Sequence, residues 1–249
     1  MHPEGTAGVF AEIRQKIQGR QFSTLEELQS FTDRFMRQRN QAPMADFHGL
    51  SPDSMHRILH FPFDSPNLVT YATVVAGEPG APILPLFGLL LEAIGEGGLK
   101  PTATGNLPRN FCREAASVYW GEEAIREDGR FVHINKEEDF SHLHVTRVVA
   151  GLSGLIRKSR GFILSRDCRR SLAEHRLAGI YPRLLLFYVR DFNWAYRDGF
   201  PDLGFTQRSF LYTLYLLNVY GGEWLPEVFY EDAFIRAFPS PDFSPALMK

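Results

Sequence analysis

The sequence has few cysteines and no long apolar run. Only two cysteines occur in 249 residues, Cys112 and Cys168, and they form no Cys-x-x-Cys pair. This scarcity excludes a disulfide-rich scaffold and favours two reduced, buried thiols. The longest unbroken apolar run, Leu184–Val189, is far shorter than the roughly 20 residues of a membrane-spanning helix. We therefore expect no membrane span.

The sequence also lacks an excess of one charge. It holds 27 Lys and Arg against 29 Asp and Glu, a net charge of −2. This balance argues against binding of nucleic acid by a surface that is basic overall, so any electrostatic function must be local. No charged-then-apolar leader follows Met1. We therefore expect no secretory signal, and a cytoplasmic protein.

Apolar residues and helix signals are abundant. Apolar residues make up 44% of the chain, and its 21 Phe favour packed helices over a sheet rich in Val and Ile. Signals for helix starts and stops recur along the chain, whereas alternating runs are few. We predict a mainly α fold with minor β, a helical bundle with winged-helix-like units. Strands are expected only near residues 99–104, 131–134 and 155–165.

Two turn units, Leu99–Ala116 and Gly161–Ala173, carry the clearest local pattern. Each consists of a short extended run, a turn and a helix. Gly105 marks the turn of the first unit because glycine tolerates positive φ. Around the second unit, two β-prone runs within residues 155–164 flank a polar turn, which predicts a hairpin. Ser165 is placed to cap the helix that follows.

These turn units resemble elements of a known group of proteins. The string LKPTATGNLPRNFCREA is similar to the L-x-x-T-x-x-G-x-L-P element of an uncharacterised bacterial family, and more distantly to plasmid open-reading-frame-three-like, transposon-passenger-like proteins. Gly151–Leu172 resembles the matching hairpin. Pro101 interrupts the first strand, and Ser165 and Cys168 replace the usual Thr and small residue. The resemblance covers roughly residues 85–175. It implies a winged-helix-like module without an established activity.

A candidate linker suggests how the chain is divided. Gly77–Pro85, GEPGAPILP, is rich in Gly and Pro, which is typical of a connection between domains. We predict an N-terminal helical region at 1–78, a tandem winged-helix-like region at 79–178 and a C-terminal helical region at 179–249.

One helix of the C-terminal region is apolar nearly all round. In Phe210–Tyr220 only Thr213 and Asn218 are polar. Such a helix belongs at the centre of a bundle. We therefore predict that it is buried, and that Leu214→Ala and Leu216→Ala each destabilise the protein.

A basic cluster is the strongest local departure from the balanced charge. Clustered Lys and Arg bind phosphate backbones by releasing counterions. The cluster would be either a nucleic-acid contact, a contact with a protein partner, or a solvated face balanced by the acidic stretch Glu122–Asp139. Only one carboxylate, Asp167, opposes its six cations, which are Arg157, Lys158, Arg160, Arg166, Arg169 and Arg170.

Histidine groups offer a weaker alternative. Asp139, His142 and His144 have the chemistry of metal ligands, but the two histidines are two positions apart and point to different faces of a helix. His56 and His60 have the spacing of two ligands on a helix and lack an acidic partner. We predict no metal, no cofactor and no catalytic residue.

The leading interpretation is a non-catalytic cytoplasmic protein of unknown role that contacts nucleic acid through the basic hairpin and helix. A protein-interaction or assembly factor that uses an aromatic surface is the alternative. A metal-dependent enzyme is a third, which depends only on the histidines. The oligomeric state stays open. The aromatic residues in question are Phe187, Tyr188, Phe192, Trp194 and Tyr196.

Overall fold

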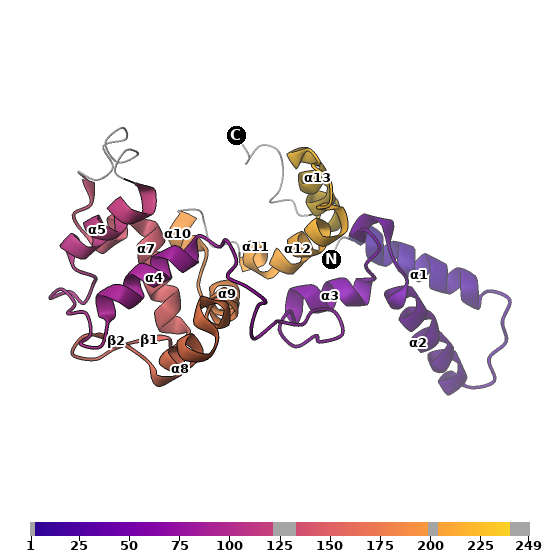
Figure 1. Cartoon of the computed structure of the whole chain (residues 1–249). Coiled ribbons are helices and arrows are strands. Elements are labelled where there is room, and N and C mark those ends of the chain that lie inside the picture. Colours follow the sequence, from indigo (N-terminus) through magenta and orange to yellow (C-terminus); the bar gives the residue numbers. More distant parts are fainter. Residues whose placement is uncertain (1–2, 122–132, 199–203, 240–249) are drawn as a thin grey trace. The chain divides into compact units, whose positions relative to one another are not determined.

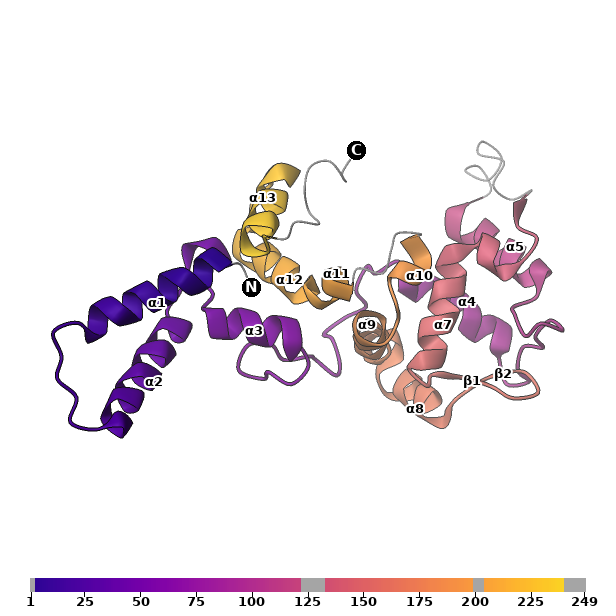
Figure 2. The same ribbon diagram turned by 180° about the vertical axis from the view of Figure 1, so that it is seen from behind.

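The computed structural model describes residues 3–121, 133–198 and 204–239. Within these ranges the backbone is mainly helical, with a single two-stranded sheet (Figures 1 and 2). The predicted fold class, mainly α with minor β, is therefore confirmed. None of the described helices is long and apolar enough to cross a membrane.

The chain divides into two compact units. Unit 1 combines Met1–Val69 with Arg208–Lys249, and unit 2 is Thr70–Gln207. The predicted boundaries near residues 78 and 178 both fall within unit 2. The predicted boundary near residue 78 depended on a run of Gly and Pro, which marks a local turn of the chain. Such a run gives no sign that the C-terminal segment rejoins the N-terminal helices in one unit.

Unit 1 is built from helices at the two ends of the chain. The cap of α3 follows the predicted pattern, because the Ser51 side chain accepts a hydrogen bond from the Ser54 amide and Pro52 opens the helix. In this unit, α12 packs against α3 and α13. The elements are α1 (Pro3–Ile17), α2 (Leu25–Gln41), η1 (Ala45–Phe47), α3 (Pro52–His60), α12 (Phe210–Tyr220) and α13 (Glu227–Ala237).

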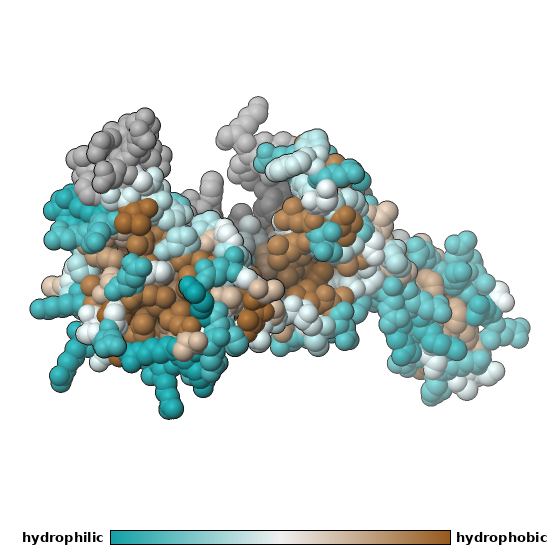
Figure 3. Space-filling view, viewed as in Figure 1, coloured by the Kyte–Doolittle hydropathy of each residue, from teal (hydrophilic) through white to brown (hydrophobic). Residues whose placement is uncertain are grey.

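The prediction that α12 is buried all round is wrong. Tyr212 and Leu216 are buried, but Leu214 is 51% exposed and Leu217 47%. Figure 3 shows apolar surface over this part of unit 1. The helix packs on α3 and α13, and Leu214 and Leu217 are left exposed. A sequence that is apolar on every face does not specify which face will be covered.

Unit 2 is organised around α7, which packs against both α4 and α9 (Figure 1). Phe87 of α4, Leu143 of α7 and Leu184 of α9 are completely buried in its core. The elements are α4 (Ile83–Ile94), α5 (Arg109–Trp120), η3 (Glu137–Asp139), α7 (Ser141–Leu152), β1 (Ile156–Lys158), β2 (Phe162–Leu164), α8 (Arg166–His175), η4 (Arg176–Gly179), α9 (Tyr181–Arg190) and α10 (Ala195–Asp198). Along the chain, the division between Gln207 and Arg208 falls within the short α11 (Gly204–Arg208).

The hairpin predicted within 155–165 is confirmed. β1 and β2 are antiparallel, with Lys158 opposite Phe162. On the other side of β2, Leu99 and Phe162 exchange two backbone hydrogen bonds of 2.9 and 2.8 Å. The two predicted turn units therefore pair with one another through Leu99 and Phe162.

The strand predicted at 99–104 is limited to Leu99. Pro101 has no N–H to continue a ladder. The Thr102 amide donates to the Asn106 carbonyl at 2.9 Å, and the Thr102 hydroxyl accepts from the Asn106 amide at 3.0 Å. Gly105 has φ +85°, which glycine adopts without strain. These contacts close a compact turn where an extended strand was expected.

A strand was expected at 131–134, but residues 133–134, which are the described part of this range, form no strand. Residues 131–132 lie outside the described ranges, as does most of the acidic stretch 122–139. Ile134 is buried outside any strand, and its carbonyl accepts a hydrogen bond from the Arg113 guanidinium at 2.9 Å.

Both cysteines are free and buried, as predicted. Burial raises the pKa of Cys112 to about 12 and that of Cys168 to about 11. Thiolate is the reactive form. We therefore expect neither thiol to react with an aromatic disulfide reagent at neutral pH in the folded protein, and both to react after unfolding in guanidinium. Rapid labelling of the folded chain would contradict this burial.

Candidate functional site

The hairpin directs its cations to two different sides. Arg157 lies opposite Ile163, and both side chains are exposed. Lys158 lies opposite Phe162, with its ammonium 6.0 Å from that ring centroid. A Cβ on Gly105 would clash with this ammonium, so Lys158 extends along the turn of the first unit. Arg157 and Lys158 therefore do not share one surface.

The tip of the hairpin forms part of an open pocket. Arg160 and Ser159 face Gly97, Gly98 and Lys100 around a space of about 370 Å³. Lys100 was not among the predicted site residues. It reaches the hairpin because Leu99, its neighbour in the chain, pairs with Phe162, and the local charge pattern gave no sign of that pairing.

The helix after the hairpin presents three cations to solvent. The Ser165 side chain caps α8 by accepting a hydrogen bond from the Cys168 amide at 3.1 Å. Cys168 then points into the core, and Arg166, Arg169 and Arg170 are exposed. Arg170 pairs with Asp167 at 3.2 Å.

All six predicted basic residues are exposed. Apart from Arg170, none of them forms an ion pair with a described residue. The hairpin and α8 are neighbours in both ribbon views (Figures 1 and 2), and Figure 3 shows that the edge of unit 2 which they occupy is hydrophilic. The exposed cations of the hairpin tip and of α8 lie along this edge, which we call the basic edge. Lys158 is directed away from it, along the turn at Gly105.

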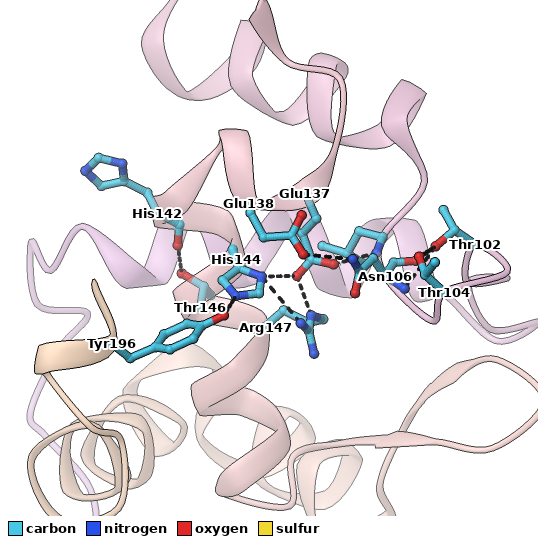
Figure 4. A network of polar contacts seen from close by, with 11 residues as sticks. Thr102, Thr104, Asn106, Glu137, Glu138, His142, His144, Thr146, Arg147 and Tyr196 are labelled. Atoms are coloured by element: carbon cyan, nitrogen blue, oxygen red, sulfur yellow. Dashed lines mark hydrogen bonds and ion pairs between the residues drawn. The ribbon is translucent and has the colours of Figure 1, made fainter. Parts of the chain in front are cut away.

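A second group of polar side chains was missed by the sequence interpretation (Figure 4). Glu137, at the start of η3, is fully buried. Its carboxylate accepts hydrogen bonds from the Leu107 amide at 2.6 Å, from His144 Nδ1 at 2.7 Å and from Arg147 Nε. His144 Nε2 in turn lies 3.1 Å from the Tyr196 hydroxyl. We call Glu137, His144 and Arg147 the buried triad.

The electrostatics of the buried triad favour an ionised Glu137. Burial alone would raise the pKa of this carboxyl, but the hydrogen bonds from His144 and Leu107 and the charge of Arg147 outweigh it, so its pKa lies below the ordinary value. Facing an ionised carboxylate, His144 Nδ1 carries a proton. The other ring nitrogen, Nε2, lies within hydrogen-bond distance of the Tyr196 hydroxyl.

An open pocket of about 450 Å³ lies beside the buried triad. Its polar lining includes Glu138, whose Oε1 accepts a hydrogen bond from Asn106 Nδ2 at 2.8 Å. The other oxygen, Oε2, is buried and has no hydrogen-bond partner among the described residues. The pocket is lined by Asn106, Glu138, His144, Arg147, Val148, Leu152, Phe192, Asn193 and Tyr196.

The histidines considered as metal ligands have other partners. Figure 4 shows His142 pointing away from His144, and the His142 ring lies near Phe140 with 6.3 Å between centroids. Asp139 accepts hydrogen bonds from the backbone amides before η3. Within the described ranges, no three His, Cys, Asp or Glu residues are grouped to hold a metal ion.

The aromatic residues proposed as a partner surface are mostly packed. Phe192 is buried, and Phe187, Tyr188 and Trp194 pack against the core of unit 2. Tyr196 is the exception, at 63% exposure. This packing removes most of the aromatic surface that a protein-interaction factor would use.

Comparison with family models, with curated proteins and with solved structures found no match for this chain. The resemblance of the turn units to an uncharacterised bacterial family therefore stays a prediction.

Proposed function

We propose that unit 2 binds the phosphate backbone of nucleic acid through its basic edge. The observation that carries this proposal is the set of exposed cations on the hairpin tip and α8, of which only Arg170 is paired with a described carboxylate. Cations without a protein partner are available to replace the counterions of a phosphate chain. Lys100 and Arg160 both line the pocket at the hairpin tip and place two positive charges where a backbone phosphate would approach.

The order of elements supports a winged-helix-like arrangement for this contact. Helices α4, α5 and α7 precede the hairpin, and Leu99, between α4 and α5, pairs with β2. The hairpin tip would be the wing. The helix directly before the hairpin, α7, is mostly buried between α4 and α9, which leaves few side chains to read base edges. Since phosphate contacts position a protein and base contacts specify a sequence, binding would show little sequence preference.

The dependence of affinity on salt tests the proposal. If about four cations neutralise phosphates, the log–log slope for wild type should be roughly −3 to −4. Replacement of Arg157, Arg160 and Arg166 together by Ala should flatten the slope by about two to three units. Lys158→Ala should change it least, because Lys158 is directed along the turn of the first unit. Affinities for duplex DNA and for RNA would be measured by fluorescence anisotropy.

A matched control removes the same charge elsewhere. Arg14, Arg34 and Arg37 are exposed on α1 and α2 of unit 1, and the triple Ala variant at these positions should keep the wild-type slope. Surface charges contribute little to stability, so circular dichroism should show all variants folded. Absence of binding to either nucleic acid at low salt would refute the proposal, as would equal slopes for the two triple variants.

A further inference from the structure

An apolar pocket of about 240 Å³ lies among three helices of unit 2. Its buried lining residues come from all three helices: Leu86 from α4, Val145 from α7 and Leu184 from α9. Spaces between the helices of a bundle are a preferred place for small-molecule sites. The pocket shares no lining residue with the basic cluster or with the pocket at the hairpin tip, so it is a separate feature of unit 2.

The predicted linker Gly77–Pro85 contributes to this pocket. Its residues Ala81, Pro82 and Ile83 are part of the lining. Ala81 and Ile83 are only partly exposed and pack against the core of unit 2. This segment therefore forms part of the wall of a pocket within unit 2, where its composition had suggested a connection between domains.

The lining is almost entirely apolar and holds no Asp, Glu, Lys or Arg. The hydroxyl of the buried Thr146 is satisfied within α7, because it donates to the His142 carbonyl at 2.8 Å (Figure 4). A charged ligand would lose hydration here without gaining a partner of opposite charge. An apolar lining also holds water poorly, since a bound water molecule needs two to four polar partners. The pocket therefore favours a neutral, apolar molecule.

The size of the pocket and its aromatic residues narrow the choice further. An apolar cavity of about 150 Å³ holds a benzene ring, so about 240 Å³ has room for a ring with several more atoms. Three lining residues are aromatic: His142, Tyr181 and Tyr188. Aromatic rings pack favourably against one another, offset or edge to face. The Tyr188 ring is held in place by stacking on Phe192 and Trp194, whose centroids each lie 5.6 Å from it.

We infer that this pocket binds a neutral small molecule built on one or two aromatic rings. The ligand carries no charge, and its rings lie against the apolar side chains that α4, α7 and α9 contribute. Binding is driven mainly by the removal of apolar surface from water. The inference does not depend on the proposed function, because the phosphate contacts of the basic edge involve none of these residues.

Calorimetric titration of the full chain with three probes tests the inference, at about pH 8, where histidine side chains are ordinarily neutral. The probes are indole, indole-3-acetate, which adds a carboxylate to the same rings, and 1-hexanol, which is neutral and aliphatic. Indole should bind saturably. Indole-3-acetate should bind at least about tenfold more weakly, because its charge finds no partner in the lining. Hexanol should also bind more weakly than indole, because it lacks a ring to pack against the aromatic residues.

A variant that fills the pocket locates the binding. Ala81→Leu adds three carbons to the lining and should weaken indole binding by about tenfold or more, since a single methylene in an apolar pocket already changes recognition on this scale. Ala173→Leu adds the same atoms at an exposed position of α8 and should leave binding unchanged. Methyl NMR of the wild-type protein is a second readout. Indole should shift the signals of Val145 and Leu184, but not that of Leu214, which is exposed on α12 of unit 1.

The inference is overturned if indole does not saturate the wild-type protein at millimolar concentration, or if folded Ala81→Leu binds it with unchanged affinity. Shifts at Leu214 without shifts in the pocket would also overturn it. Hexanol that binds as tightly as indole would contradict the assignment to aromatic ligands, and indole-3-acetate that does so would contradict the requirement for a neutral one.

Discussion

Replacement of Glu137 by Ala is expected to lower the free energy of unfolding of unit 2 by about 3–5 kcal/mol, because it breaks a buried ionic network by removing one partner. Glu137 is fully buried and accepts hydrogen bonds from Leu107, His144 and Arg147. Without its carboxylate, the guanidinium of Arg147 loses its ion-pair partner, and the amide of the buried Leu107 loses its acceptor.

Tryptophan fluorescence during urea unfolding would measure this change. Two tryptophans lie in unit 2: Trp120 packs on Phe140 with ring centroids 4.6 Å apart, and Trp194 donates a hydrogen bond to the Tyr188 carbonyl at 2.9 Å. Trp224 of unit 1 is fully exposed and should contribute little change in signal. Glu92→Ala is the control and should shift stability by no more than about 0.5 kcal/mol. Equal stability of Glu137→Ala and wild type would refute the role of the buried triad.

Acid should remove the contribution of Glu137 to the free energy of unfolding. Because the pKa of this carboxyl is lowered in the folded protein, its stabilising effect is complete above the unfolded-state value of about 4.3 and is lost as the pH falls through the lower folded-state value. The difference in stability between wild type and Glu137→Ala should therefore shrink below about pH 4. A difference that stays constant into this acidic range would show that packing, and not the charge, carries the effect.

Leu216→Ala in α12 should cost about 2–5 kcal/mol, whereas Leu214→Ala should cost less than about 1 kcal/mol. The two substitutions remove the same atoms from the same helix, two residues apart. Leu216 is 1% exposed and would leave a cavity, while Leu214 is 51% exposed and already contacts water. Each variant is thus a control for the other.

Hydrogen exchange of the peptide that covers α12 would report on unit 1 directly. Leu216→Ala should accelerate exchange throughout the helix, since destabilisation raises the population of opened states. Leu214→Ala should leave the pattern close to that of wild type. Equal and large effects at both positions would mean that the exposed side of α12 is covered in solution.

The sequence predicted local features well where local chemistry decides them. The hairpin was predicted because two β-prone runs flank a polar turn, and Ser165 caps α8 as expected. Both features depend on residues within a few positions of one another. The pairing of Leu99 with Phe162 depends on packing across the whole unit. No local pattern marks it, so Lys100 was overlooked as a neighbour of the hairpin tip.

The buried triad was missed for a related reason. Glu137 lies in an acidic stretch, and such stretches are usually solvated. Its burial follows from His144 and Arg147, which are three positions apart and share a face of α7, together with the Leu107 amide from a distant turn. The combination of Glu137 before the helix with His144 and Arg147 on it was visible in the sequence. Only the fold shows that these side chains meet.

The insertion of unit 2 within unit 1 sets an order for folding during synthesis. All of Thr70–Gln207 leaves the ribosome before the segment that contains α12 and α13, so unit 2 can complete its core first. Helix α3 can pack against α12 only after α12 has been synthesised, because the whole of unit 2 separates the two helices in the sequence. Contacts at such separations make folding slow. A folded unit 2 would shorten the flexible length of chain between these helices, and so reduce the entropy lost when unit 1 closes.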